Sequence, residues 1–411
     1  MCASNISLTD ALKMSQPSRF SMMVKPVGGE CNMSCPYCYY SGKGVTIKDK
    51  GIMDEELLES FIKQYIEASE DEASFCWHGG EPLLAGIDFY RKAVTLQEKY
   101  KGSKNINNSI QTNGLLIDNE WCRFFIDNGF LIGISIDGTK EIHDKGRLDK
   151  RGRPTFDRII SAIEMMRRHG VEYNLMCTIS KHSEGHGKEV YRFLRQMGEF
   201  IQFMPVFEHL PISEAHDTVV GMMRHTTVAP WSVSAEGFGK FMTDVFDEWV
   251  KSDVGRIFVQ MFDVTLERWY GMPASFCAFS ETCGDSLVIE HNGDVFPCDH
   301  FVFPNHLLGN INHNNIMELR SSLRQFDFGM MKRRLLPEQC ERCRYLFLCN
   351  GGCPKHRLII DGKGNPGLNA LCEGYKIFFA HSEPVMRKMC DLLDHGLPPS
   401  LVTKDLNGEA R

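Results

Sequence analysis

Short apolar runs alternate with segments of helical periodicity along the first two hundred residues. In the clearest helical segment, apolar residues recur at positions 57, 58, 61, 62, 65 and 66. The apolar runs predict six strands, at 20–27, 74–77, 109–112, 130–136, 173–179 and 200–206. The patterns between them predict helices at 53–69, 86–100, 118–128, 156–169 and 188–197. Strands separated by helices in this way predict an α/β fold with a parallel sheet and crossover helices.

The pattern changes twice beyond the sixth strand. Residues 209–230 carry no clear periodicity, and helical spacing returns at 237–254 and 257–270. Short segments, turns and cysteines then dominate up to position 372, and a helical, finally polar tail begins at about 383. We therefore expect four parts, which are a barrel domain at 20–235, a helical connector at 236–272, a cysteine-rich domain at 273–382, and a C-terminal helix and tail at 383–411.

Polar and cysteine motifs follow the predicted strands at the point where each strand ends. Cys31 follows the first strand, His78–Glu81 the second, Asn113 the third and Asp137 the fourth. Function in parallel sheets gathers at the carboxyl ends of the strands. The sequence therefore predicts a functional site at this edge of the sheet.

Charge and hydropathy narrow the class of protein. The net charge of -7 does not suggest a nucleic-acid partner. The short basic cluster of Lys332, Arg333 and Arg334 is interpreted as a solvated helix face. No apolar run approaches the roughly 20 residues that a membrane span requires, and residues 1–19 lack a signal pattern. We expect a soluble, cytoplasmic protein without a membrane partner.

Sixteen cysteines are many for 411 residues, and they are clustered. In a reducing compartment such clusters indicate metal ligation or redox chemistry. Cys31, Cys35 and Cys38 have the spacing C-x3-C-x2-C, and three thiolates hold three corners of a 4Fe–4S cluster and leave one iron open. A zinc site is the alternative, but it needs a fourth ligand, and no His or Cys occurs between Cys38 and Cys76.

These three cysteines resemble the signature of the radical S-adenosylmethionine (SAM) superfamily, C-x3-C-x-aromatic-C, with Tyr37 in the aromatic position. The resemblance implies a partial (β/α)6 TIM-like barrel. It also implies that the open iron binds the amino and carboxylate groups of SAM, and that one electron then cleaves the cofactor to a 5′-deoxyadenosyl radical. The cofactor supplies this chemistry and the protein supplies position and shielding.

The same resemblance implies the cofactor-binding residues. The motif Gly79, Gly80 and Glu81 matches the G-G-E loop, whose glycines allow close approach and whose carboxylate is expected to meet the cofactor ammonium. Tyr37, Ser135 and Arg147 match further cofactor contacts, and an Arg fork suits a carboxylate. The alternative for each residue is an ordinary loop position, and Arg151 and Arg153 lie close enough to be mistaken for Arg147.

A second group of eight cysteines occupies the C-terminal part of the chain. Its members are Cys277, Cys283, Cys298, Cys340, Cys343, Cys349, Cys353 and Cys372. Eight thiolates suffice for two clusters with four ligands each, and a pair of four-cysteine zinc sites fits the spacing equally well. The radical SAM motif upstream favours iron–sulfur.

This array resembles the SPASM domain of radical enzymes that modify peptides. The resemblance implies interleaved ligands. Cys277, Cys283, Cys298 and Cys353 are expected at the first auxiliary cluster, and Cys340, Cys343, Cys349 and Cys372 at the second. With full ligand sets both clusters are closed, so electron transfer or a structural role is expected of them.

Nearly the whole chain resembles the anaerobic sulfatase-maturating enzymes. The matching segments are 23–27, 31–40, 79–81, 111–114, 135–138, 298–299, 308–310 and the closing cysteine array. The resemblance implies three 4Fe–4S clusters, oxidation of a sulfatase Cys or Ser to Cα-formylglycine on an unfolded or nascent polypeptide, and flavodoxin or ferredoxin as electron donor. A thioether-forming SPASM maturase and a zinc scaffold without catalysis remain the alternatives.

Asp299 and Tyr40 match the family's candidates at the substrate. Asp299 directly follows Cys298 and matches the family's base. A cluster ligated by four thiolates is negatively charged, and a like charge nearby is expected to make this carboxylate a stronger base. Tyr40 matches a residue of the substrate cavity, by resemblance alone. The remaining cysteines match no ligand position.

Overall fold

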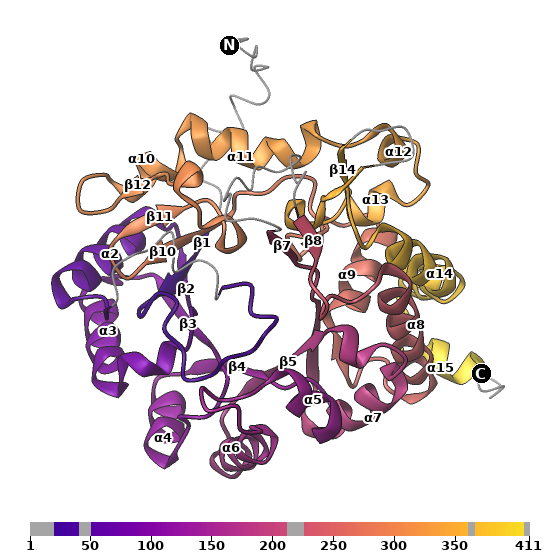
Figure 1. Ribbon diagram of the computed structural model, residues 1–411, viewed down its shortest axis with the longest axis horizontal. Coiled ribbons are helices and arrows are strands. Elements are labelled where there is room, and N and C mark those ends of the chain that lie inside the picture. The colour runs from indigo at the N-terminus through magenta and orange to yellow at the C-terminus, as the bar shows by residue number, and fades with distance from the viewer. Residues whose placement is uncertain (1–19, 41–50, 212–225, 361–365, 407–411) are drawn as a thin grey trace.

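The computed structural model describes residues 20–40, 51–211, 226–360 and 366–406. A curved sheet with the strand order β12-β11-β10-β1-β2-β3-β4-β5-β6-β9 organises the chain, and helices cover its outer face (Figure 1). The six predicted strands are all present and lie side by side, each parallel to the next. They are β1 (Ser21–Lys25), β2 (Glu72–Trp77), β3 (Asn105–Thr112), β4 (Phe130–Ser135), β5 (Tyr173–Ile179) and β6 (Phe200–Pro205). The predicted partial barrel is confirmed.

The five predicted crossover helices end within two residues of their expected bounds. They are α2 (Glu55–Ala68), α3 (Ile87–Tyr100), α4 (Asn119–Asp127), α6 (Phe156–His169) and α7 (Gly187–Met197). Asp54 caps α2 by accepting from the Leu57 amide at 2.8 Å, and Asp118 caps α4 in the same way. The short helix α5 (Lys140–Gly146) was missed because its polar sequence has no apolar face.

The cysteine-rich part extends the barrel sheet, which the sequence did not predict. Strand β10 (Ser286–Glu290) pairs in parallel with β1 and places Glu290 beside Lys25. Strands β11 (Asp294–Phe296) and β12 (Gly309–Asn310) continue from β10 in antiparallel order. The loop after β11 is thereby brought beside the loop after β1, which lies inside the curve of the sheet (Figure 1).

Three helices close the other side of the molecule. They are α8 (Ala235–Ser252), α9 (Gln260–Trp269) and α14 (Cys372–Asp394). Helix α14 runs without a break through position 383, where the sequence suggested a separate tail, because its apolar face continues against α8. The remaining elements are β7 (His209–Pro211), β8 (Thr226–Val228), β9 (Phe258–Val259), α10 (Ile316–Arg320), α11 (Leu323–Arg334), α12 (Glu338–Glu341), α13 (Leu346–Cys349), β13 (Ile359–Ile360), β14 (Pro366–Leu368) and α15 (Leu401–Leu406), with 3₁₀ turns η2 (Pro82–Ala85), η3 (Lys181–Ser183), η4 (Asp299–Phe301), η5 (Pro304–His306) and η6 (Pro354–His356).

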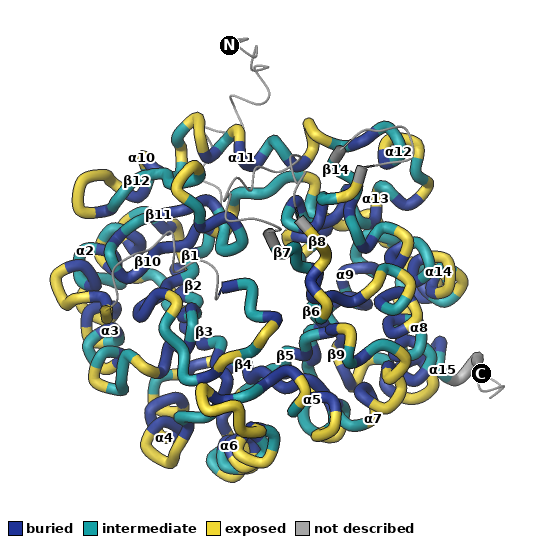
Figure 2. The backbone as a smooth tube through the Cα atoms, viewed as in Figure 1, coloured by how far each residue is buried: buried dark blue, intermediate teal, exposed yellow. Residues whose placement is uncertain are grey.

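Burial follows the sheet, and exposed positions gather on the outer turns of the helices (Figure 2). One predicted surface position is wrong. Lys332 on α11 has no exposed surface, although its neighbours Arg333 and Arg334 reach solvent as expected. No helix in the described part of the chain combines the length and apolarity that a membrane crossing needs.

The close contact of α8 with α14 depends on glycine. A Cβ on Gly374 would overlap the carbonyl oxygen of Ala235, and one on Gly239 would lie 2.8 Å from the carbonyl of Gly374. We expect Gly374→Ala to destabilise the protein by about 1–3 kcal/mol, because backbone rather than a flexible side chain must move. Thermal unfolding followed by circular dichroism tests this. Asp391→Ala, on the same helix with a side chain 74% exposed, is the control and should change stability by less than about 0.5 kcal/mol.

Candidate functional site

Three cysteines lie together in the loop after β1. Burial raises the pKa of Cys31 to about 11 and of Cys35 to about 12, and in both cases the nearby Cys38 sulfur adds to the shift. The Met33 backbone amide donates to the Cys31 sulfur at 3.4 Å, and the side-chain amide Nδ2 of Asn113 donates to it at 3.7 Å. Buried thiols that share a space and accept N–H groups are suited to bind metal as thiolates. The donor set fits a 4Fe–4S cluster with one open iron.

The two predicted glycines press the loop after β2 against the loop before Cys31. Gly79 adopts a φ of 138°, and a Cβ there would lie 2.8 Å from the Gly28 carbonyl. A Cβ on Gly80 would overlap the carbonyl of Glu30, whose oxygen accepts from the Glu81 amide at 2.7 Å. The glycines therefore hold the cysteine loop in place, in addition to any approach to a cofactor.

Glu81 is buried at the end of the loop after β2. Its side chain is fully buried and accepts from Thr112 Oγ1 at 2.8 Å, the Asn113 amide at 2.8 Å and the Leu83 amide at 3.0 Å. Burial raises its pKa to about 7, and these hydrogen bonds oppose the shift. The carboxylate thus joins the ends of β2 and β3.

Tyr37, Asp137 and Arg147 form one buried cluster behind the cysteines. Arg147 Nε lies 2.9 Å from Asp137 Oδ2, its Nη2 donates to Thr178 Oγ1 at 2.9 Å, and the Tyr37 hydroxyl donates to Asp137. Asp137 raises the pKa of Arg147, against burial, and the guanidinium stays charged. Ser135, at the end of β4, accepts from Gln111 at 3.0 Å. The cofactor residues inferred from the sequence therefore gather at the same edge of the sheet.

Asp299 lies between the first cysteine group and the C-terminal one. Its Oδ1 is 2.5 Å from Lys25 Nζ, and its Oδ2 accepts from the Tyr39 hydroxyl. Tyr39 directly follows Cys38, and Asp299 directly follows Cys298. Both carboxylate oxygens are thus held, with 12% of the side chain exposed.

Lys25 changes the electrostatic argument for Asp299. The sequence suggested that a negative cluster nearby strengthens this carboxylate as a base. In the structure the fully buried ammonium of Lys25 contacts this carboxylate directly, so a positive charge as well as a cluster lies beside it. Lys25 Nζ also lies 3.3 Å from His78 Nδ1 and 4.4 Å from the centre of the Tyr40 ring.

Tyr40 packs against Lys25 and Glu290. The residue is 3% exposed, and its hydroxyl donates to Glu290 on β10. Burial, followed by Glu290 and Asp299, raises the pKa of Tyr40 far above its usual range. The ring is therefore a neutral surface against which the Lys25 ammonium packs.

The eight C-terminal cysteines separate into two groups in space. Cys353 lies close enough to affect the sulfurs of Cys277, Cys283 and Cys298, and burial raises the pKa of all four thiols. The structure thus brings together the four residues inferred for the first auxiliary cluster, although Cys353 follows Cys340, Cys343 and Cys349 in the chain.

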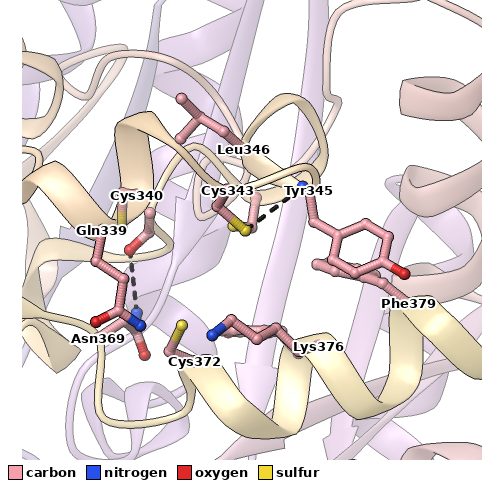
Figure 3. A pocket seen from close by; sticks show the side chains of 12 residues that line it. Gln339, Cys340, Cys343, Tyr345, Leu346, Asn369, Cys372, Lys376 and Phe379 are labelled. Carbon is pink, nitrogen blue, oxygen red and sulfur yellow. Dashed lines mark hydrogen bonds between the residues drawn. The ribbon is translucent and has the colours of Figure 1, made fainter.

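The other four cysteines line a small cavity, of about 20 Å³, at the start of α14 (Figure 3). Cys340, Cys343, Cys349 and Cys372 line it together with Asn369, Tyr375 and Lys376. The amine of Lys376 points towards Cys372 across this space (Figure 3). No three metal-ligating side chains converge on a single point in the described part of the chain. A cubic cluster does not require such a convergence, because each thiolate binds a different iron atom.

Four residues of the site were missed in the sequence. Lys25 and Glu290 end neighbouring strands, and both have no exposed surface. A charge within an apolar strand was the available signal for Lys25. Tyr39 was passed over between two tyrosines with assigned roles, and His78 was seen only as part of the loop.

Comparison with known proteins agrees with this arrangement. Residues 26–194 match the model of the radical SAM superfamily, and residues 277–344 match the SPASM model, described as an iron–sulfur cluster-binding domain. The protein is a radical SAM oxidoreductase with a SPASM domain. Its cofactors are SAM and 4Fe–4S clusters, and its three cysteine groups correspond to three clusters.

Relatives over nearly the full length define the family more narrowly. The serine-type anaerobic sulfatase-maturating enzyme of Bacteroides thetaiotaomicron is 43% identical over 94% of both chains. The cysteine-type enzyme of Clostridium perfringens is 34% identical over 89% of this chain and 96% of its own. The solved structure of anSMEcpe with bound AdoMet and the Cp18Cys peptide matches with a TM-score of 0.80 at 32% identity, over 91% of this chain and 99% of its own. The chain belongs to the anaerobic sulfatase-maturating enzymes.

The ligand set of the second auxiliary site predicts a specific loss of iron. We expect Cys372→Ala to remove up to about four of the roughly twelve iron atoms that three clusters hold. Cys390→Ala is the matched control, because Cys390 lies on the same helix and away from the cavity. Iron and sulfide analysis with EPR spectroscopy measures the effect. An unchanged iron content in Cys372→Ala would contradict this ligand assignment.

Proposed function

We propose that this enzyme oxidises the active-site Cys or Ser of a sulfatase to Cα-formylglycine. The observation that carries the proposal is Asp299, a carboxylate held between Tyr39 of the first cysteine loop and Cys298 of the first auxiliary group. This position suits a reaction in which a hydrogen atom is removed on the side of the first cysteine loop and an electron is accepted on the side of the auxiliary group. The names of the relatives support sulfatase maturation, and the serine-type relative at 43% identity favours Ser as the target.

The oxidation removes two electrons and two protons from the target side chain. One hydrogen atom leaves Cβ, one proton leaves the hydroxyl or thiol, and the last electron leaves towards an acceptor. When bound, SAM and the first cluster supply the 5′-deoxyadenosyl radical that takes the hydrogen atom. With a Ser target the product is a C=O group, which is the aldehyde. With a Cys target the product is a C=S group, which water hydrolyses to the aldehyde with release of sulfide.

The remaining steps, which are proton removal and electron removal, are assigned to residues of this chain. Asp299 accepts the proton, and Lys25 and the Tyr39 hydroxyl hold its two carboxylate oxygens in place. Cys31, Cys35 and Cys38 would hold the first cluster, and Cys277, Cys283, Cys298 and Cys353 would hold an auxiliary cluster that could accept the electron. Because Asp299 adjoins Cys298, the proton and the electron leave on the same side of the substrate.

Cofactor contacts are proposed for the residues that surround the first cysteine group. The backbone of Gly79, Gly80 and Glu81 receives the methionine end of SAM, while Ser135 and the Arg147 cluster face its ribose and carboxylate. The buried Glu81 side chain keeps this loop on β3. Tyr37 closes the rear of the site through Asp137.

The partners follow from the chemistry. The substrate is a sulfatase segment that is still unfolded, because its active-site side chain must enter the barrel. A flavodoxin or ferredoxin supplies and removes single electrons. We propose a cytoplasmic site of action, since thiolate-ligated clusters need a reducing compartment.

A peptide assay tests the proposed reaction. The protein is reconstituted anaerobically with iron and sulfide, then given SAM, a reductant, and peptides with a Cys-x-Pro-x-Arg or Ser-x-Pro-x-Arg motif. We expect a peptide aldehyde to form in step with 5′-deoxyadenosine, which mass spectrometry measures together. Cofactor cleavage with a thioether product, or with no change in either peptide, would refute sulfatase maturation.

The role of Asp299 has its own test. Asp299→Asn should keep three clusters and cleave SAM, but lower the rate of aldehyde formation by about 10²–10⁴-fold, since the amide does not accept the proton. Asp294→Asn is the control, because Asp294 lies in the neighbouring strand β11 and is bonded to Asn310. An unchanged aldehyde rate in Asp299→Asn would show that another group is the base.

A further inference from the structure

Two buried cations lie among the eight auxiliary cysteines. Lys332 on α11 has no exposed surface, and Arg357, four residues after Cys353, is 2% exposed. Lys332 Nζ donates to the carbonyls of Cys277 and Ala278 at 2.8 and 2.9 Å. The ammonium is therefore fixed against the loop that carries the first two ligands of the first auxiliary group.

Helix α11 is built to reach this loop. A Cβ on Gly329 would lie 2.5 Å from the carbonyl of Cys283, and the Cys283 amide donates to the Gly329 carbonyl at 3.1 Å. Gln325 donates to the Gly284 carbonyl at 2.8 Å. The close approach of the helix backbone brings Lys332 inside, one turn further along.

Arg357 joins the two auxiliary groups. Its Nε donates to the Gly351 carbonyl at 3.1 Å, its Nη2 donates to the Asn350 carbonyl at 2.7 Å, and its Nη1 donates to the carbonyl of Lys332. The sulfurs whose charge acts most strongly on it come from both groups, namely Cys340, Cys283, Cys353 and Cys349. The guanidinium thus lies between the two sets of ligands.

Neither cation has a carboxylate within ion-pair distance in the described part of the chain. The negative groups that act most strongly on Lys332 are Cys283, Cys353 and Cys277. A buried charge is costly unless it is paired, and carbonyl dipoles replace hydration only in part. A cubic cluster with four thiolates carries net negative charge, so it would be the missing partner of these two cations. The buried cations would in turn stabilise the buried negative charge of the cluster.

We propose that Lys332 and Arg357 are built-in counter-charges of the auxiliary clusters, and that Lys332 raises the reduction potential of the first one. A fixed positive charge stabilises the reduced, more negative state of a cluster, and net charge and hydrogen bonding are established determinants of cluster potentials. The Lys332 ammonium hydrogen-bonds only to the loop of the first group, although its charge also acts on Cys349 of the second, so we expect its larger effect at the first cluster. The neighbouring Arg333 is 54% exposed and pairs with Glu281, so it does not contribute.

This inference deepens the proposed function and rests on it for its consequence. When bound and oxidised, the first auxiliary cluster would accept the one electron that remains after Cβ loses a hydrogen atom and the hydroxyl or thiol loses a proton. A higher potential at this cluster favours that transfer, and the one-electron carrier then reoxidises it. The charge pairing itself is measured without any peptide.

An EPR-monitored redox titration of the reconstituted holoenzyme tests the proposal. Lys332→Met removes the charge and the donor, whereas Lys332→Gln removes the charge and keeps a donor for the carbonyls. Arg333→Met is the matched control. The same titrations in full-length chains with Cys31, Cys35 and Cys38 changed to Ala identify the auxiliary signals.

We expect both Lys332 variants to shift one auxiliary midpoint downwards, with about a tenfold lower ratio of reduced to oxidised cluster at a fixed potential, or about 59 mV for one electron. Arg333→Met should leave all midpoints unchanged. A third variant, Lys332→Arg, keeps the positive charge. Loss of one cluster in the Met and Gln variants, but not in Lys332→Arg, also supports the proposal. Full clusters with unchanged midpoints, or loss of the cluster in Lys332→Arg as well, would overturn it. Absence of aldehyde with sulfatase peptides would refute the proposed function and leave these potentials as measured.

Discussion

The parallel pairing of β1 with β10 is the constraint on which the site depends. This pairing joins a strand of the barrel to a strand of the SPASM region, and its last register pair is Lys25 with Glu290. Asp299 follows β10 and β11 closely, so the pairing places it over the end of β1. The ion pair with Lys25 and the contact with Tyr39 are then short-range consequences. Without β10 the candidate base and the first cysteine loop would belong to separate domains.

Charge in the interior is organised around sulfur. The three cysteine groups contain eleven thiols, and each group has a buried cation beside it or within reach. Arg147 lies near Cys35 and pairs with Asp137, while Lys332 and Arg357 have no carboxylate partner among the described residues and lie near cysteine sulfurs. Lys25, by contrast, forms an ion pair with the carboxylate of Asp299. The cations are therefore distributed according to the negative groups that each region must stabilise when its metal is bound.

Local pattern predicted the barrel well and the added strands poorly. The first six strands and their helices have strong period-two or helical spacing, so their positions follow from residues close in sequence. Strands β10, β11 and β12 are short, and β10 finds its partner more than two hundred residues away, so no local signal marks it as part of the same sheet. Helix α14 was divided in the prediction because its start is also the position of the ligand Cys372.

By itself, the sequence determined the chemistry of this protein, because cysteine spacing and the loops after the strands are local features that a particular cluster requires. The candidate base Asp299, by contrast, was inferred from the resemblance to the sulfatase-maturating family. Tertiary structure alone decided which charges surround these groups. Lys332 belongs to a polar helix, and only the packing of Gly329 against the Cys283 loop turns it inwards. Lys25 and Glu81 likewise obtain their roles from partners on other strands, since burial and ion pairing depend on residues that meet only when the chain has folded.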